Sequence, residues 1–169
     1  MKTKKTYIHY GNTKLDRSRF GSKISRRFTL GSKPDFGCLW ASPMDDDSFT
    51  WKDWCDCEGF MKCDENNSFK FSLTDNAKVL NIYTENYIIH YIQRNPLFGN
   101  TFTAMFIDEN EHIRTGICDS IDFQKILNDG YDGIELFNAR SLHYTVFNSW
   151  DCDSIVVFNP DVIIEESED

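Results

Sequence analysis

The fold is decided by one stretch near the end of the chain, Trp150-Asp151-Cys152-Asp153-Ser154-Ile155-Val156-Val157-Phe158-Asn159-Pro160. Its apolar run predicts a buried β-strand, which Asn159-Pro160 ends because proline has no N–H to give to a sheet. Asp151 and Asp153 stand at the entrance of this strand, two positions apart, so they share one face if both belong to it. We therefore expect the strand to bring two carboxylates to the rim of a cleft, where they stabilise a developing cation.

Outward from this stretch, short apolar segments separated by turn residues predict more strand than helix. The predicted strands cover residues 6–10, 38–41, 69–73, 79–83, 101–107, 133–137 and 154–158. The predicted helices cover residues 49–61, 85–93 and 119–127, the last capped by Asp119 or Ser120. This mixture indicates an α+β fold. A chain of 169 residues has the length of one domain, which we expect over residues 1–163, followed by an acidic tail at 164–169.

The charge of the chain is strongly divided. Residues 1–33 contain ten Lys and Arg and one Asp, a net charge of +9, whereas the remaining residues carry −18. The basic segment either neutralises an acidic face of the same domain or forms a phosphate-binding stripe for a dinucleotide or a nucleic acid. No apolar run approaches the roughly 20 residues of a membrane span, and no apolar signal-peptide core follows the basic start. We therefore expect a monomeric cytoplasmic protein that does not contact membranes.

Three separated motifs fit one pattern. They are Ile8-His9-Tyr10-Gly11, then Gly37-Cys38-Leu39-Trp40-Ala41-Ser42-Pro43, and finally Gly130-Tyr131-Asp132-Gly133-Ile134 followed by the strand of residues 155–158 and Asn159-Pro160. In this order and at this chain length they resemble the ADP-ribosyltransferase superfamily, the toxin- and PARP-like fold. The resemblance spans nearly the whole chain, although residues 60–115 contribute little to it.

The resemblance implies a cleft between two small antiparallel or mixed sheets that holds NAD as a substrate. In this family the first strand holds the nicotinamide or its ribose, the second supplies a Ser or Tyr beside the nicotinamide, and a late strand begins with an acid. By position, His9 or Tyr10 with Gly11 takes the first role and Ser42 the second. The late acid is Asp153, with Asp151 as its helper. Trp40 is expected to wall the pocket, and Arg17 or Arg19 from the basic segment to contact the pyrophosphate.

Three features depart from the family pattern. His9 and Tyr10 are neighbours on a strand and therefore point to opposite faces unless the strand is bulged. Strict alignment on the last strand places Ser154, rather than Asp153, at the position of the acid, as in a catalytically inactive copy. The acid is also Asp, one methylene shorter than the commoner Glu.

The resemblance implies a mono-ADP-ribosyltransferase that moves ADP-ribose from NAD to a macromolecular acceptor, which we expect to be a protein, with nucleic acid as an alternative. Size and charge division suggest, by analogy alone, a phage or mobile-element effector that acts on a host machine. Two alternatives stay open on the same fold: an acidic non-catalytic protein that inhibits a nucleic-acid-handling enzyme, and an NAD glycohydrolase. We expect no metal, because Cys55-Asp56-Cys57 and Cys63 lack the spacing of a zinc site.

Overall fold

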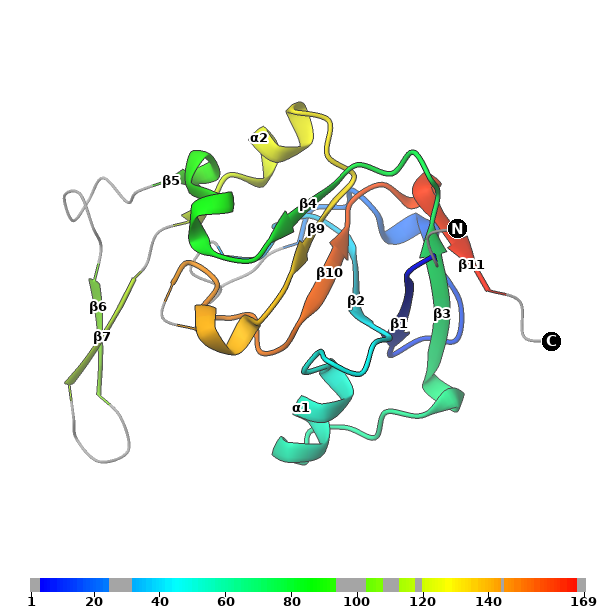
Figure 1. Ribbon diagram of the computed structural model, residues 1–169, viewed down its shortest axis with the longest axis horizontal. Coiled ribbons are helices and arrows are strands. Elements are labelled where there is room, and N and C mark those ends of the chain that lie inside the picture. The colour runs from blue at the N-terminus through cyan, green and yellow to red at the C-terminus, as the bar shows by residue number, and fades with distance from the viewer. Residues whose placement is uncertain are drawn as a thin grey trace.

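The computed structural model describes residues 4–24, 32–93, 103–107, 113–117, 120–143 and 145–166. A seven-stranded sheet runs through the molecule in the strand order β11-β3-β1-β2-β10-β9-β4 (Figure 1). Its strands are β1 (Thr6–Tyr10), β2 (Leu39–Pro43), β3 (Ser68–Leu73), β4 (Val79–Ile82), β9 (Gly133–Leu136), β10 (Ser154–Val157) and β11 (Ile163–Glu165). Neighbouring strands are antiparallel except for the pair of β4 and β9. The expectation of a mostly sheet α+β fold is confirmed at this level.

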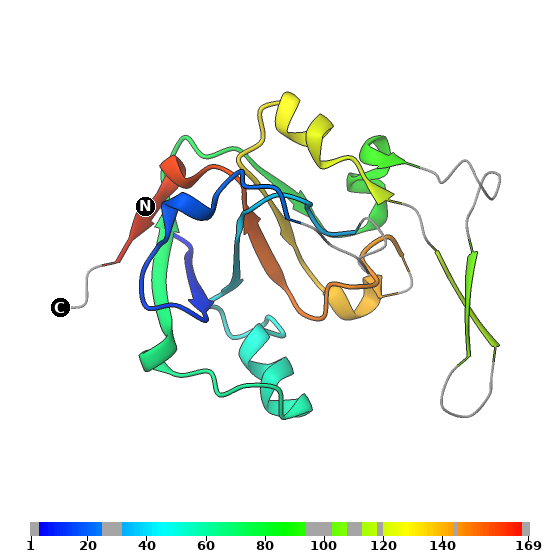
Figure 2. The ribbon, with the colours of Figure 1, turned by 180° about the vertical axis from the view of Figure 1, so that it is seen from behind.

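Short elements surround the sheet. The α-helices are α1 (Trp51–Glu58) and α2 (Phe123–Asn128), and the 3-10 helices are η1 (Arg17–Arg19), η2 (Glu65–Asn67), η3 (Glu85–Tyr87), η4 (Ile89–Tyr91), η6 (Ala139–Leu142) and η7 (Pro160–Val162). Two small sheets pair β5 (Ile92–Gln93) with β8 (Ser120–Ile121), and β6 (Thr103–Ile107) with β7 (Ile113–Ile117). Figure 2 shows β6 and β7 standing apart from the seven-stranded sheet. Among the residues described, no helix has both the length and the apolarity to cross a membrane.

Two of the three predicted helices differ from the structure. The segment 85–93 forms η3, η4 and β5 instead of one helix, because Tyr, Ile and His are weak helix formers and Ile88 and Ile92 are drawn toward the core. The third helix begins at Phe123, because Asp122 accepts the Lys125 N–H at 2.9 Å and caps it. Ser120 lies in β8 instead, and Asp119 lies outside the described residues.

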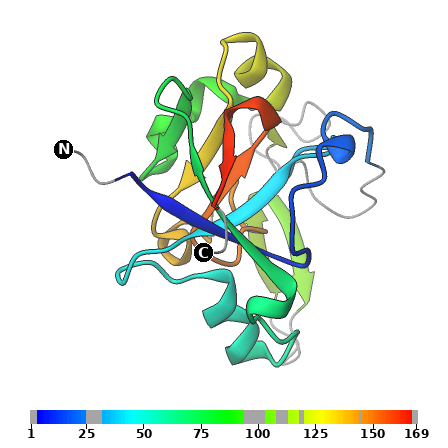
Figure 3. The same cartoon turned by 90° about the vertical axis from the view of Figure 1, so that its right-hand side faces the viewer.

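Strand β2 joins two halves of the sheet. Its first three residues, Leu39–Ala41, pair with β10, and its last two pair with β1, where Ser42 faces Ile8. The last two residues of β1, His9 and Tyr10, pair with β3 but have no partner on β2. In Figure 3 the dark blue β1 and the cyan β2 cross at an angle. The sheet therefore opens where β1 leaves β2.

Strand β10 is buried on both faces, which explains its continuous apolar sequence. Val156 packs into one core with Ile134 and Trp150, beneath α2 and the 3-10 helices. Ile155 packs into a second core on the opposite face with Phe71. Neighbouring residues of β10 thus belong to different sides of the sheet, as the alternation of a strand requires.

The acidic C-terminal residues extend into the fold. Ile163–Glu165 pair with the outer edge of β3 as β11, because two apolar isoleucines begin the segment. The Glu165 carboxylate accepts the Leu15 N–H at 3.0 Å, and that of Glu166 accepts the Thr6 hydroxyl at 2.9 Å. Residues 164–166, expected in the tail, are therefore attached to the sheet, and residues 167–169 lie outside the described part of the chain.

Candidate ligand-binding cavity

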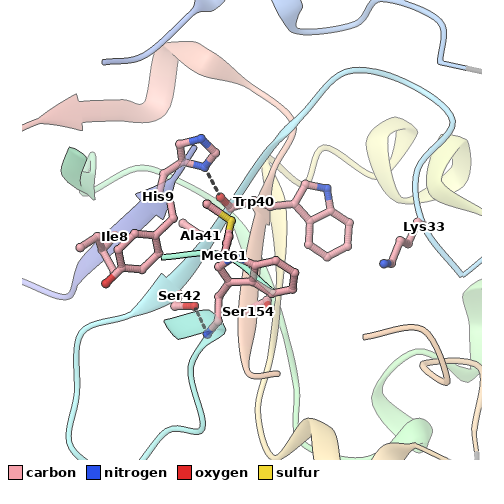
Figure 4. Close-up of a pocket in the computed structure, with 10 residues that line it drawn as sticks. Ile8, His9, Lys33, Trp40, Ala41, Ser42, Met61 and Ser154 are labelled. Atoms are coloured by element: carbon pink, nitrogen blue, oxygen red, sulfur yellow. Dashed lines mark hydrogen bonds between the residues drawn. The ribbon is translucent and has the colours of Figure 1, made fainter. Parts of the chain in front are cut away.

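A cavity of about 330 Å³ opens on the side of the sheet where β1 and β2 separate (Figure 4). Residues from β1, β2, β10 and α1 share its wall with residues of two loops. They are Ile8, His9, Tyr10, Lys33, Trp40, Ala41, Ser42, Trp51, Met61 and Ser154. The lining is largely aromatic and apolar, with a few convergent polar groups, which is the usual make-up of a small-molecule pocket.

Four of the residues assigned to NAD line this one cavity: His9, Tyr10, Trp40 and Ser42. His9 and Tyr10 both reach it, although β1 pairs regularly with β3 and has no bulge, because the edge of β1 is left open beyond Ile8. Gly11 is absent from the wall. It turns the chain with a φ of 117° and donates its N–H to the Asn67 carbonyl at 2.6 Å.

His9 is held in one tautomer. Its Nδ1 lies 2.7 Å from the Trp40 carbonyl oxygen, and since that oxygen only accepts, Nδ1 carries the proton. Nε2 is then the acceptor, and Asn12 Nδ2 lies 3.5 Å from it. Burial lowers the pKa of His9 below its ordinary 6.5, although the bond to Trp40 opposes this and Arg19 adds to it. The ring is therefore neutral at neutral pH.

Two buried serines, Ser42 of β2 and Ser154 of β10, line the cavity. The Ser42 Oγ accepts the Trp51 N–H at the start of α1 at 2.9 Å, and Figure 4 shows this bond at the floor of the cavity. The hydroxyl proton of Ser42 has no acceptor among the described residues. The Ser154 Oγ donates to the Cys152 carbonyl at 3.0 Å. Ser42 thus offers a fixed donor to a ligand, and Ser154 forms the neighbouring surface.

Tryptophans form the flat walls. Trp40 packs against the buried Trp150 with ring centroids 4.7 Å apart. The Trp150 Nε1 donates to the Ser32 carbonyl at 2.7 Å, which fixes the loop that carries Lys33. The Lys33 Nζ lies 5.6 Å from the centre of the Trp40 ring, on the side away from His9 (Figure 4). One end of the cavity therefore holds a neutral imidazole and the other an ammonium group.

The predicted catalytic acids lie elsewhere. Strand β10 begins at Ser154, so Asp151 and Asp153 precede the strand instead of sharing one face of it. Asp153 is only 8% exposed, and its Oδ1 accepts the Ala139 N–H at 2.7 Å. It lines a second pocket of about 480 Å³ together with Phe49, Phe137 and Arg140. Asp151 is half-buried and lines neither pocket.

Arg17 and Arg19, expected near the pyrophosphate, do not line the cavity and are engaged with other groups. The Arg17 Nη1 donates to the Pro160 carbonyl at 2.9 Å and lies 3.3 Å from Asp161, and the Arg19 Nε lies 3.1 Å from Asp16. Lys5, another residue of the basic segment, pairs with Glu135.

The Lys5 Nζ lies 2.7 Å from Oε1 of the buried Glu135 and forms an ion pair with it. The orientation of this contact is not that of a hydrogen bond. These pairs favour neutralisation within the domain. Arg26 and Arg27 lie outside the described residues.

Sequence reasoning missed Lys33 and Met61 as parts of the wall. Lys33 follows Ser32 and precedes a buried proline, and no local pattern marks a cavity there. Met61 lies in the segment after α1, and a methionine there predicts only a packing role. Trp51, at the start of α1, also lines the cavity.

The described residues offer no metal site, and burial disfavours the thiolate form of two of the cysteines. Cys55, Cys57, Cys63 and Cys152 form no disulfide with one another. Across the described residues, no three His, Cys, Asp or Glu side chains are grouped so as to hold a metal ion. Burial raises the pKa of Cys63 to about 12 and that of Cys152 to about 11, so both remain protonated at neutral pH.

The cavity can therefore hold a flat ring between aromatic faces, with one hydroxyl donor and one cation at its wall. Comparison with known proteins adds no relative to this description, since no family model, no curated protein and no solved structure matches the chain.

Proposed function

We propose that the protein is a mono-ADP-ribosyltransferase that binds NAD through its nicotinamide end in this cavity and moves ADP-ribose to a macromolecular acceptor. The observation that carries the proposal is the meeting of three strands. His9 and Tyr10 of β1, Trp40 and Ser42 of β2, and Ser154 of β10 line one cavity, although more than 140 positions separate the first from the last. The resemblance assigned nicotinamide binding to the first two of these strands and the acid to the start of the third.

The chemistry of the wall suits a nicotinamide ring. The ring of oxidised NAD is cationic, and the faces of tryptophan and tyrosine attract cations. A neutral His9 adds no repulsion. The Ser42 hydroxyl can donate to the oxygen of a carboxamide. A volume of about 330 Å³ is at the lower end for ligand pockets and suits half of a dinucleotide. Lys33 then lies where a phosphate group can meet it.

Transfer places one requirement on Asp153. When the bond between ribose and nicotinamide breaks, both electrons leave with nicotinamide and the ribose carbon becomes electron-poor. An anion beside it stabilises this state, and the acceptor then bonds to that carbon and gives its proton to a base. Asp153 precedes the cavity residue Ser154, so it is the assigned acid nearest along the chain. To act, its carboxylate must exchange the Ala139 N–H for the ribose.

Ser154 favours a second candidate, a protein that binds NAD in the same cavity without transferring ADP-ribose. Among the described lining residues there is no carboxylate, and Ser154 stands where strict alignment expects the acid. In this candidate the cavity recognises the ligand, and binding alone is the function.

Incubation with NAD labelled in its adenylate half distinguishes the candidates. Label attached to a protein or a nucleic acid supports the transferase, whereas free ADP-ribose identifies an NAD glycohydrolase. NAD binding without turnover supports the second candidate. The Asp153→Asn variant keeps an acceptor for the Ala139 N–H and should lose transfer while keeping NAD affinity. Absence of NAD binding to the folded wild-type protein would overturn both candidates.

A further inference from the structure

An aromatic patch lies beside the mouth of the cavity, made of Trp51, Trp54 and Phe60. The two tryptophan rings are stacked, with centroids 4.7 Å apart at 18°. The ring of Phe60 packs edge-on against Trp51 and tilted against Trp54, with centroids at 5.9 and 5.5 Å. Both tryptophans are half-buried and Phe60 is 63% exposed. Figures 1 and 2 show α1, which carries the tryptophans, at the lower edge of the molecule.

The backbone holds Phe60 in this exposed position. Helix α1 ends at Gly59, which adopts the left-handed conformation with φ 62° and ψ 31°. The N–H groups of Gly59 and Phe60 both point to the Cys55 carbonyl, the latter at 3.1 Å. This reversal returns the chain onto the helix and fixes the ring against Trp51 and Trp54. A large apolar ring held in solvent by its own backbone indicates a contact surface.

The aromatic patch is continuous with the cavity, because Trp51 and Met61, the residue after Phe60, also line the cavity. The surface around it is acidic. Residues 44–61 contain six Asp and Glu and one Lys, a net charge of −5. That lysine, Lys52, is paired with Asp56. Glu58, at the end of α1, is exposed.

These charges also reach the cavity mouth. The pKa of Tyr10 lies above its ordinary value, chiefly because the residue is buried and next because Cys63 is near. Lys52 opposes this rise, whereas the carboxylates of Asp53 and Asp56 add to it. An anionic surface repels the phosphates of a nucleic acid and attracts Lys and Arg, whose cationic groups also bind well over tryptophan faces.

We propose that the aromatic patch of Trp51, Trp54 and Phe60 is a docking surface for a basic, apolar segment of a partner protein. Apolar side chains of the segment pack on Phe60 and the tryptophans, and its Lys or Arg side chains meet the acidic rim. The docking surface stands without the NAD chemistry proposed above. If that chemistry holds, the surface lies where an acceptor protein is presented to the cavity.

Binding of three fluorescent probes to the full chain, without NAD, tests the proposal. The probes are a 15-residue peptide that alternates Lys or Arg with Leu, the same peptide with Glu in place of the basic residues, and a single-stranded DNA 15-mer. The basic peptide should bind, with an affinity that falls as salt is added, and the other two should not. Phe60→Ala should weaken the binding of the basic peptide at least about fivefold, because exposed aromatic anchors carry much of the binding energy of such contacts. Tyr87→Ala, which removes a 55% exposed ring on η3, is the matched control and should have no effect.

Charge reversal tests the acidic rim in the same assay. Glu58→Lys should weaken the basic peptide more than Asp75→Lys, an equal change in net charge at an exposed turn beyond the other end of β3. Equal binding to wild type and Phe60→Ala, or preference for the DNA, would overturn the proposal. A wild-type dimer that Phe60→Ala dissociates would overturn it too, since a second copy would then be the occupant. NAD affinity, measured on the same variants, should not change, so the two proposals fail separately.

Discussion

Asp153 and Ser154 are neighbours in the chain, yet they face two pockets of opposite character. The Ser154 pocket is largely aromatic and apolar and is bordered by a neutral histidine. The Asp153 pocket is larger and is lined by three aspartates and an arginine, whose guanidinium lies 3.7 Å from the centre of the Phe49 ring. The first has the features of a ligand site. In the second, the buried carboxylate already has a structural task, because it binds the Ala139 N–H.

The contrast shows how one position along the chain sends two neighbouring side chains at a strand entrance into different pockets. Because side chains alternate across a sheet, the residue that follows an acid faces the opposite side. A hydroxyl therefore lines the cavity between β1, β2 and β10, and the carboxylate secures the loop that begins η6 at Ala139.

The largest expected effect breaks the structural side of this contrast. Asp153→Ala should lower the free energy of unfolding by about 2–3 kcal/mol, because it leaves the buried Ala139 N–H without its charged acceptor. Ser154→Ala should cost about 1 kcal/mol or less, since it removes one neutral hydrogen bond to Cys152. Urea denaturation measures both. Equal losses would mean that the hydrogen bond from Ala139 to Asp153 adds no more stability than that of the Ser154 hydroxyl.

The next effect sharpens the ligand side. Lys33→Ala should weaken NAD binding about fivefold, because an ammonium group near a phosphate contributes about 1 kcal/mol. Nicotinamide, which has no phosphate, should bind wild type and variant alike. Arg140→Ala changes only the Asp153 pocket and serves as the control in the same titration calorimetry. A larger loss of NAD affinity in Arg140→Ala than in Lys33→Ala would mean that NAD binds in the Asp153 pocket.

The smallest effect concerns the neutral histidine of the cavity. The folded state lowers the pKa of His9 below its ordinary 6.5, so the unfolded chain takes up a proton first as the pH falls. Stability from this group is complete above pH 6.5 and declines below it. Between pH 6.5 and 5.5 the loss is no more than about 1.4 kcal/mol. His9→Gln should show a shallower decline in this window than wild type. Parallel curves for wild type and His9→Gln would contradict the neutral state.

The strands were predictable where apolar runs end at strong turn signals. Thr6 to Tyr10, bounded by Gly11, and the run before Asn159-Pro160 are strands in the structure. The helices were harder. The segment 85–93 contains apolar residues at both helical and extended spacings, and only contacts with the core decide its short turns.

The cavity was predictable for residues that lie on strands. His9, Tyr10, Trp40 and Ser42 lie on β1 and β2, whose pairing brings them together. Lys33 comes from an irregular loop fixed by a bond between Trp150 and Ser32, which no local pattern reveals. The orientation of Asp153 depended on where β10 begins, and strand ends are the least certain part of such a prediction.

A crystal structure of the protein grown with saturating NAD tests the central claim most directly. We predict that the nicotinamide ring lies in the cavity between β1 and β2, within hydrogen-bond distance of the Ser42 hydroxyl and close to Trp40. A ring bound in the pocket of Asp153 and Arg140, or an empty cavity at saturating NAD, would contradict the account.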